Sequence, residues 1–361
     1  MSLQFIAGSS GSGKTRYLYE EIIRESMNHP ENWYLVLVPE QYTMQTQKEL
    51  IRLHPRRGLT NVDVLSFNRL AYRVFEDLAV ETLTVLDDMG KSMVLRKVAA
   101  DKKRELHYYQ RHLSQMGFVS QLKSLLSELY QYGVTPQRLE ELKEQAAKPV
   151  LREKLEDVSL MVKSFQEYIE NKFTTAEQVL DLCCEQLPKW ERLPKSEVYL
   201  DGYTGFTPIQ YGILEICMKL CRRVRVTVTA DPEENLYREG EKSDLFYMSR
   251  HMVCRLIDGA ARAGVFHERD VILNPKVPWR FHESPGLAYL EQNLGRFKAG
   301  KGGNFWPKDR GCEEVKVFCG RNPAKEVAFV CRQIEKNVRK GLRYRDMAVV
   351  TGDLPSYGRE V

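Results

Sequence analysis

The residues with the clearest chemical potential lie near the amino terminus, where Gly-x-x-x-x-Gly-Lys-Thr occupies residues 8–15. A loop of this kind needs glycines because its backbone folds around phosphate groups with the N–H groups pointing inward. Lys14 would then place its charge on the β- and γ-phosphates of a nucleotide, and the Thr15 hydroxyl would bind Mg²⁺. The pattern predicts a nucleotide site formed by Gly8, Ser10, Gly11, Ser12, Gly13, Lys14 and Thr15.

A flexible Gly/Ser stretch is the alternative interpretation of this loop, and its surroundings disfavour it. Residues 3–7 form a short apolar run typical of a buried strand, and the apolar spacing from Thr15 onward is helical. Strand, loop and helix in this order would place the phosphates at a helix N-terminus.

The elements that must position this loop are predicted by apolar, β-rich runs spread along the chain. They lie at residues 34–38, 62–65, 197–200, 224–228, 315–318 and 347–350. Several are followed at once by polar or Gly-containing turns, as expected for parallel strands whose C-terminal ends carry the site. With helical segments between them, these runs predict an α/β fold with a P-loop (RecA-like) parallel sheet.

The pattern changes along the chain and predicts four regions. Residues 1–86 and 181–270 form the P-loop domain, and residues 87–180, with 3.6-residue apolar spacing and no strand candidates, form an all-helical insertion. Residues 271–312 are rich in Pro, Gly and charge and are interpreted as a linker. Residues 313–361 are expected to be the truncated start of a second RecA-like domain, since one βαβ start cannot easily bury its own faces.

Composition limits the class of protein without assigning a function. The net charge of +5 says little about nucleic acid, and no apolar run approaches the ~20 residues that a membrane span needs. With no secretory signal recognisable, the expected location is cytoplasmic. The eight cysteines show no paired C-x-x-C arrangement, so a reduced, structural role is expected.

A second candidate for the metal site is Asp201, which ends the apolar run at 198–200. An Asp at a strand end beside a phosphate loop is where P-loop enzymes hold Mg²⁺ together with the Ser or Thr of the loop. Thr15 and Asp201 are therefore the predicted Mg²⁺ ligands.

In their order, these segments resemble the first motor domain of UvrD-type superfamily 1 helicases. The resemblance runs from the phosphate loop through a Thr-bearing loop at Thr43, a Ser-Phe-x-Arg-Leu segment at 66–70 and the helical insertion to Asp201. Within that group, essentially the whole chain resembles the N-terminal half of the AddB (RexB) family of AddAB-type helicase–nuclease subunits. The similar segments are FIAGSSGSGKT, LVLVPEQYT, VLSFNRLAYRVF, VYLDGYTGFTPIQY and GLRYRDMAVV.

This resemblance implies a role in double-strand break repair by homologous recombination. It implies an AddA-type motor and nuclease subunit as partner, DNA ends as substrate, and single-stranded DNA that is read for the recombination hotspot called Chi. The family's nuclease domain and its iron–sulphur cluster are expected to lie outside this chain.

Three departures from the active-helicase pattern predict that ATP is bound with little or no hydrolysis. Gly202 stands where active motors carry the Glu that acts as general base, a role that usually contributes about 10²–10⁴-fold. Glu234 replaces a Gln, and an ionised Glu cannot donate a hydrogen bond to a γ-phosphate. Only Met1 and Ser2 precede the first strand, where active relatives carry an adenine-contacting Gln.

Loops at the same sheet edge carry the residues predicted to bind single-stranded DNA. Bases stack on aromatic side chains at ~1–3 kcal/mol each. Gln41 could read base edges, and Arg69 could pair with phosphate or with a guanine edge. Phe67 has an equally strong alternative as a core residue of a buried helix stripe. The predicted set is Gln41, Thr43, Phe67, Arg69, Tyr72 and Tyr203.

Two other functions fit the phosphate loop. An autonomous ATP-driven translocase would need another carboxylate, such as Glu233 or Glu234, to compensate for Gly202. A small-molecule kinase would need a substrate pocket with an Arg-bearing lid, for which the long helical insertion is a poor match.

Overall fold

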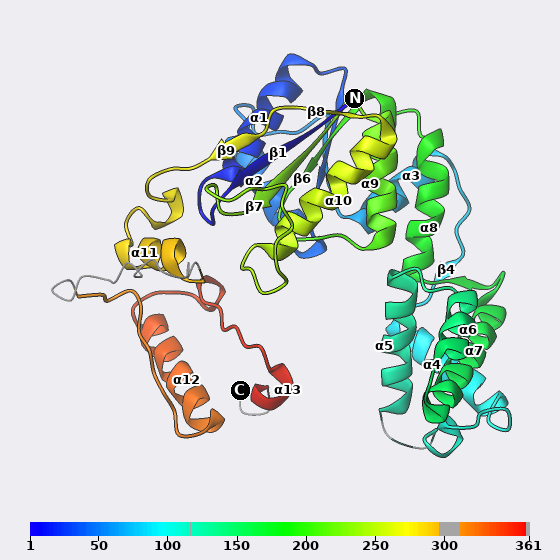
Figure 1. The fold of residues 1–361 in the computed structure, drawn as a ribbon. Coiled ribbons are helices and arrows are strands. Elements are labelled where there is room, and N and C mark those ends of the chain that lie inside the picture. Colours follow the sequence, from blue (N-terminus) through cyan, green and yellow to red (C-terminus); the bar gives the residue numbers. More distant parts are fainter. Residues whose placement is uncertain (114, 116, 296–310, 359–361) are drawn as a thin grey trace. The chain divides into compact units, whose positions relative to one another are not determined.

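The computed structural model describes residues 1–113, 115, 117–295 and 311–358. The chain divides into two compact units, Met1–Arg280 and Phe281–Val361. Figure 1 shows that the first unit contains a sheet covered by helices and, within the same unit, a separate group of helices.

The first unit is built on a seven-stranded sheet with the order β3-β2-β6-β7-β1-β8, in which β9 also pairs with β1. Every pairing recorded in this sheet is parallel. The α/β class predicted from the sequence is therefore confirmed. The strands are β1 Ser2–Gly8, β2 Trp33–Leu37, β3 Val62–Leu65, β6 Ser196–Leu200, β7 Arg223–Thr229, β8 Phe266–His267 and β9 Val271–Leu273.

Six helices cover the two faces of this sheet. Their starts follow local sequence signals: the Ser66 side chain accepts from the Arg69 N–H at the start of α3, and the Gln210 side chain accepts from the Thr207 N–H at the start of α9. The helices are α1 Lys14–Asn28, α2 Thr43–Leu53, α3 Phe67–Asp77, α8 Ala176–Gln186, α9 Pro208–Leu220 and α10 Tyr247–Ala263.

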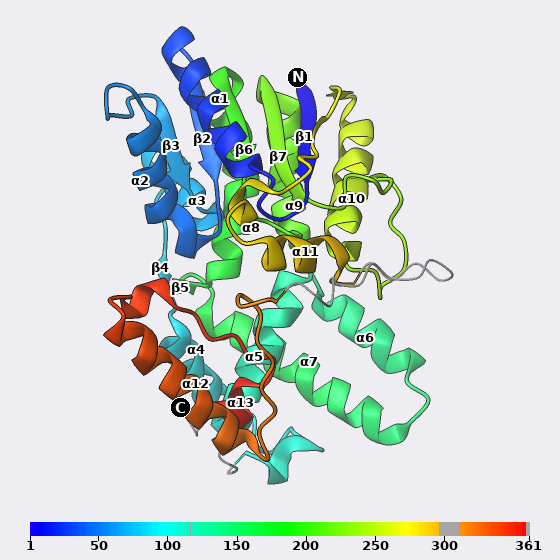
Figure 2. The same ribbon diagram turned by 90° about the vertical axis from the view of Figure 1, so that its left-hand side faces the viewer.

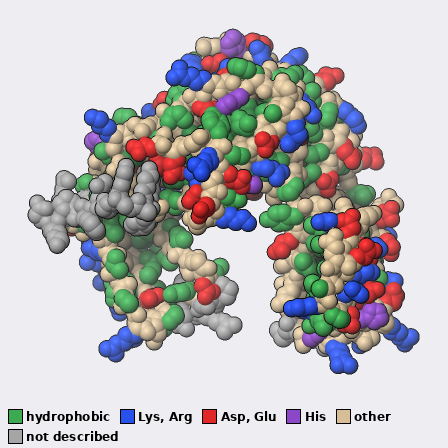
Figure 3. Space-filling view, in the orientation of Figure 1, with side chains coloured by type: hydrophobic (Ala, Val, Ile, Leu, Met, Phe, Trp, Pro, Cys, Tyr) green, Lys and Arg blue, Asp and Glu red, His purple; other side chains and the backbone are tan. Residues whose placement is uncertain are grey.

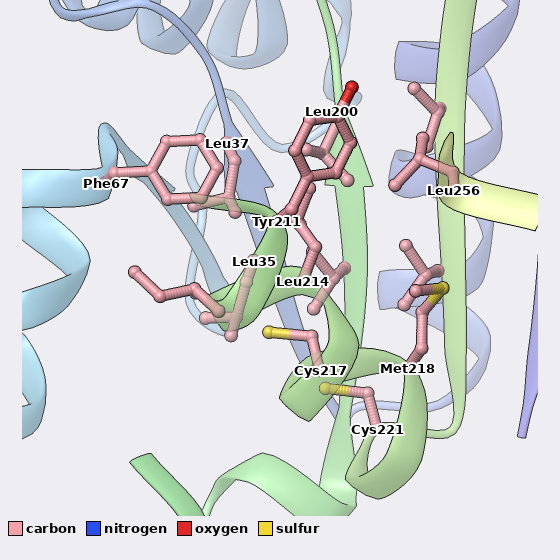
Figure 4. Close-up of a cluster of buried hydrophobic side chains, with 14 of the residues drawn as sticks. Leu35, Leu37, Phe67, Leu200, Tyr211, Leu214, Cys217, Met218, Cys221 and Leu256 are labelled. Atoms are coloured by element: carbon pink, nitrogen blue, oxygen red, sulfur yellow. The ribbon is translucent and has the colours of Figure 1, made fainter. Parts of the chain in front are cut away.

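Alternate residues of the same strands are buried on opposite faces. Ile6 and Val36 belong to a cluster with residues of α1 and α2, whereas Leu35 and Leu37 belong to a cluster with residues of α3, α8, α9 and α10. Figure 2 shows α1 and α2 together on their side of the sheet. Figure 4 shows the second cluster, in which the strand residues face Leu214 and other residues of α9.

The segment between α3 and α8 forms a helical bundle with its own core, made of α4 Asp88–Asp101, α5 Phe118–Gln131, α6 Pro136–Gln145 and α7 Pro149–Ile169. Acidic and basic side chains alternate over its surface (Figure 3). The expectation of no strands in this region is wrong: β4 Thr84–Val85 pairs with β5 Phe173–Thr174. Strands of two residues are too short to leave an apolar pattern in the sequence.

Helix α8 connects the bundle with the sheet. It starts at Ala176, and Val179 and Cys183 are buried in the cluster beneath α3 and α9. At its first turn, Glu177 pairs with Lys91 of α4 at 2.9 Å, and both side chains are largely buried. Burial alone would raise the pKa of the Glu177 carboxyl, but the hydrogen bond from Lys91 and the charge of Lys91 lower this pKa overall. The helix thus runs through residue 180, where the insertion was expected to end.

Residues 271–312, expected as a linker, begin with sheet structure. β9 pairs with β1 in the register Ile6↔Val271 to Gly8↔Leu273, so the sheet extends past residue 270. Residues 296–310 of this segment lie outside the described residues.

The second unit contains α11 Pro285–Asn293, α12 Pro323–Arg339 and α13 Leu354–Tyr357. Asn322 caps α12 by accepting from the Lys325 N–H, and the rings of Phe318 and Phe329 stack with centroids 3.9 Å apart. The strand predictions at 315–318 and 347–350 are wrong, because neither run is paired within the described residues and Val317 is 94% exposed. A strand needs a hydrogen-bonded neighbour as well as an apolar sequence.

All eight cysteines are free thiols. Cys217 on α9 and Cys221, which follows its last residue, are both buried. Among the described residues, no helix is long and apolar enough to cross a membrane.

Candidate nucleotide and DNA site

The loop between β1 and α1 has the shape of a phosphate cradle. Gly11 and Gly13 take positive φ values of 75° and 97°, which L side chains rarely adopt. A Cβ at Gly8 would lie 2.5 Å from the Leu273 carbonyl oxygen and 2.6 Å from Ser12 Oγ. Ser12 Oγ is buried without a protein partner. Such an orphaned hydroxyl, held in a glycine-lined turn, fits a loop that receives phosphate oxygens.

Lys14 lies inside this loop rather than in solvent. Its ammonium donates to the Ser9 carbonyl at 2.7 Å and to the Gly8 carbonyl at 3.0 Å, and the residue is only 8% exposed. Because a buried ammonium needs acceptors, these two carbonyls stabilise Lys14 within the loop. A phosphate would replace neutral acceptors with charged ones, which form stronger hydrogen bonds.

Asp201 is the centre of a buried group of hydroxyls. Its Oδ1 accepts from Thr227 at 2.6 Å and from Thr15 at 3.2 Å, and its Oδ2 accepts from Tyr19 at 3.3 Å. The structure thus brings together the two predicted Mg²⁺ ligands, Thr15 and Asp201, from different elements. Strand β7 lies between β6 and β1, so Asp201 reaches the loop across one strand and Thr227 fills the space between them.

Tyr19 connects Asp201 to helix α2. Its hydroxyl lies 3.3 Å from Asp201 Oδ2 and 3.0 Å from Thr46 Oγ1. Burial and the nearby Asp201 charge raise the pKa of Tyr19, so its hydroxyl stays protonated and can donate. The chain Thr46–Tyr19–Asp201 fixes the carboxylate beside the phosphate loop.

Gly202, the residue after Asp201, has a backbone conformation that residues with a side chain rarely adopt. Gly202 has φ +78°, in the left-handed region. A Cβ there would meet Pro39 Cδ at 3.6 Å and Tyr42 Cδ2 at 3.9 Å, which is ordinary contact. Space is therefore available, and the backbone angle is what favours glycine.

Glu234, in the loop after β7, is held by an arginine. Its carboxylate accepts from Arg250 Nη1 at 2.7 Å, and the same guanidinium also pairs with Asp244. Arg250 is only 7% exposed, so removing either acceptor would leave a buried charge poorly paired. Glu234 therefore serves to fix its loop to α10.

Trp279 is a neighbour of the phosphate loop that the sequence did not predict. A Cβ on Gly13 would lie 3.2 Å from its Cδ1, and the Arg280 N–H donates to the Gly11 carbonyl at 3.2 Å. The residue is nevertheless 71% exposed. The indole ring therefore contacts the phosphate loop and is also exposed to solvent, so a ligand bound to the loop would change its surroundings.

Binding of MgATP is therefore expected to change the fluorescence of Trp279, because the ligand would alter the polarity around its ring. The measurement is a nucleotide titration of intrinsic emission. Trp279→Phe is expected to lose the change, whereas Trp33→Phe, which removes a half-buried indole packed on Arg192, is expected to keep it. An undiminished change in Trp279→Phe would contradict the placement.

The residues predicted to bind DNA come from the turn after β2, the first turns of α2 and α3 and the loop after β6, and they differ in exposure. Arg69, Gln41 and Tyr72 are exposed. Thr43 is 4% exposed and donates to the Glu40 carbonyl at 3.0 Å, so its side chain holds the loop. Tyr203 is half-buried, and its desolvation together with the Glu40 charge raises the pKa of its hydroxyl.

Phe67 is 3% exposed, and its ring packs edge-on against Tyr203 and Phe206 at 5.7 and 6.0 Å between centroids. Figure 4 shows it turned toward the cluster that contains Leu37. Of the two interpretations of Phe67, the core residue is the one that matches this packing. In this arrangement the ring has no free face for a base.

Sequence reasoning missed Tyr19, Thr46, Thr227 and Trp279, and it did not single out Glu40. Tyr19 and Thr46 face the site from helices, and Thr227 faces it from a strand that otherwise reads as core. The register Leu200↔Val226 could have located Thr227, but register becomes known only with the sheet order.

The fold and the loop define the class: a P-loop α/β protein whose first domain carries a helical bundle between two of its strands. The family model described as "ADDB, N-terminal" matches residues 5–291, and the chain belongs to this family.

Relatives with known names agree over almost the whole chain. The B subunit of the ATP-dependent helicase/deoxyribonuclease of Lachnoclostridium phytofermentans is 37% identical over 99% of this chain and 31% of its own length. The protein of the same name from Caldanaerobacter subterraneus is 35% identical over 99% of this chain and 30% of its own length. The chain thus spans about a third of the length of the curated relatives it matches.

Proposed function

We propose that this chain is the nucleotide-holding, DNA-reading region of an AddB-type subunit, and that it binds MgATP with little or no hydrolysis. The observation that carries the proposal is the pairing of Thr15 with Asp201 next to a left-handed Gly202. Groups able to hold MgATP are assembled, whereas the position that would bear the general base is a glycine.

Each group in the loop has a separate part in holding the nucleotide. Lys14 would exchange the Gly8 and Ser9 carbonyls for phosphate oxygens, and the N–H groups at the start of α1 would donate to the same phosphates. Thr15 and Asp201 would hold Mg²⁺, which supplies positive charge to the phosphate oxygens when bound. Tyr19 and Thr227 would keep the Asp201 carboxylate in place through their hydroxyls.

The autonomous ATP-driven translocase is the weaker candidate, because Glu233 and Glu234, the two carboxylates that could compensate for Gly202, are poorly placed for that role. Glu234 is committed to Arg250, and the Glu233 N–H donates to Asp231 Oδ1 in an exposed turn. A general base must reach the attacking water and accept its proton. A carboxylate that is held in a hydrogen-bonded ion pair with a buried guanidinium has a fixed position and an occupied oxygen, so it is poorly suited to that part.

The DNA-reading part of the proposal is supported by the relatives' names and by exposed residues of the turn after β2 and of helix α3. Relatives named as the B subunit of a helicase/deoxyribonuclease imply a partner protein, which we propose is an AddA-type motor and nuclease. Exposed Arg69, Gln41 and Tyr72 offer a cation, an amide and an aromatic face, the groups that bind single-stranded DNA. We propose that this surface scans for a hotspot sequence such as Chi.

The test combines nucleotide binding and turnover in one preparation. A fluorescent ATP analogue is expected to bind only with Mg²⁺, and steady-state hydrolysis is expected to stay at background with or without single-stranded DNA. Single-stranded DNA binding that weakens as salt rises is expected in the same buffer, because phosphate contacts release counterions. DNA-stimulated hydrolysis would overturn the holding function, and binding to no DNA at low salt would overturn the reading function.

A further inference from the structure

Glu40 connects the turn after β2, which carries Gln41, with the start of α3, which carries Arg69 and Tyr72. It begins the short turn after β2, and its Oε2 accepts a hydrogen bond from Ser66 Oγ, the residue that caps α3. Its Oε1 accepts from Arg69 Nε at 2.9 Å. The hydrogen bond from Ser66 and the Arg69 guanidinium lower the pKa of the Glu40 carboxyl, so it is ionised at neutral pH.

The stability of the fold does not explain why a carboxylate stands at position 40. The side chains of Arg69 and Glu40 are 54% and 55% exposed, and ion pairs of that exposure contribute only ~0–1 kcal/mol. The cap of α3 is complete without Glu40, since Ser66 Oγ itself accepts from the Arg69 N–H. A negative charge is also unfavourable on a surface that meets a polyanion.

The contact leaves one edge of the guanidinium available. Among the described residues, the recorded hydrogen bond of the Arg69 guanidinium runs from Nε to Glu40, so the two terminal nitrogens keep their donors. Those nitrogens form the planar fork that matches two neighbouring acceptors, such as O6 and N7 of guanine. A lone phosphate would have to approach the same group past the Glu40 carboxylate.

A pocket of about 370 Å³ opens beside Glu40. Its lining includes Pro39, Ser66, Phe67, Asn68 and Tyr203 as well as the acidic Glu177 and Asp181, and Arg69 lies outside that lining. Its volume is sufficient for one unstacked base. Asn68 and Tyr203 add polar groups to walls that Phe67 and Pro39 make partly apolar, the mixture typical of small-ligand sites.

We propose that Glu40 is a specificity-determining positioning residue, which holds Arg69 by Nε and repels backbone phosphate, so that the guanidinium fork is reserved for a guanine edge of single-stranded DNA. The inference rests on the proposed reading function and decides between the phosphate and guanine partners of Arg69.

The test compares Glu40→Gln with the wild type on two labelled single strands, oligo-dT and the same length carrying three consecutive dG. Gln keeps the size and an acceptor oxygen but removes the charge. Glu49→Gln is the matched control, because it removes one charge from a carboxylate that pairs with exposed Arg52 on nearby α2. Binding is followed by fluorescence anisotropy at several salt concentrations, with thermal unfolding as a check on folding.

Wild type is expected to prefer the dG strand by about five- to a hundredfold, the range of one bidentate base contact. In Glu40→Gln, affinity for oligo-dT should rise about three- to tenfold, since removing one nearby charge changes a partly screened interaction by that order. The preference should fall by at least half. The salt slope on oligo-dT should steepen by roughly 0.7, the value for one added phosphate contact on a single strand. Glu49→Gln should change none of these.

A merely structural Glu40 would give a different result: both strands would bind more weakly to Glu40→Gln, with an unchanged salt slope. That outcome, or unchanged binding of both strands, would overturn the role of Glu40 and leave DNA reading intact. Failure of wild type and variant alike to bind either strand at low salt would instead overturn the reading function and the inference together.

Discussion

Lys14→Ala is expected to weaken binding of an ATP analogue by about 10- to 150-fold, the equivalent of the ~1.5–3 kcal/mol of a hydrogen bond to a charged group. The ammonium lies inside the loop on the Gly8 and Ser9 carbonyls, so it is already at the place that phosphates would occupy. Equilibrium titration with a fluorescent analogue in Mg²⁺ measures the loss.

Arg16→Ala is the matched control for this variant. Arg16 is two residues further along α1, is 73% exposed and pairs with Glu20, so its removal changes the net charge by the same amount outside the loop. Less than a threefold change is expected for Arg16→Ala, as for a screened surface charge. Equal losses in the two variants would mean that Lys14 acts only through long-range charge and that the loop does not grip phosphate.

Gly202→Glu is expected to lower the free energy of unfolding by about 1–2 kcal/mol and to create no ATP hydrolysis. An L residue in the left-handed region costs about that much, and the chain escapes the cost only by moving the backbone after Asp201. Either response places the new carboxylate away from the position that a general base needs. Urea unfolding and steady-state ATP turnover are the two measurements.

Two further glycine variants separate strain from charge. Gly202→Ala should lose the same stability without adding a carboxylate. Gly205→Glu adds a carboxylate to the same loop at a glycine whose Cβ position is open and whose φ is not left-handed, so it should be close to neutral. DNA-stimulated turnover in Gly202→Glu alone would show that a single side chain separates this protein from a working motor.

The parts of the fold that could be predicted are those whose signal is carried within one element. β2 is buried on both faces and appears as a nearly continuous apolar run, whereas the central β7 was recognisable by its alternating valines. β8 and β9 were not predictable, because two or three residues form a strand only when β1 offers them an open edge. Residues 315–318 show the converse, since they have the apolar pattern of a strand but no pairing partner among the described residues.

The candidate site likewise has parts that could be predicted from the sequence and parts that could not. The phosphate loop is one continuous segment whose spacing encodes its chemistry, and Asp201 followed from its place at a strand end. The hydroxyls around Asp201 come from α1, α2 and β7 and meet only through the tertiary packing. Phe67 was ambiguous because an aromatic at a helix start serves equally as core or as a stacking face until its neighbours Tyr203 and Phe206 are placed. The roles of these residues in binding stay predictions.

The pairing of β8 and β9 with β1 has a consequence for how this protein can be shortened. Together they cover Ser2–Leu3 and Ile6–Gly8 along the outer side of β1. A protein that ended before Phe266 would keep the phosphate loop and the main helices but would present β1 as a bare edge, a template for aggregation. It would also lose the Leu273 carbonyl that lies against Gly8. A soluble nucleotide-binding fragment must therefore extend beyond Leu273.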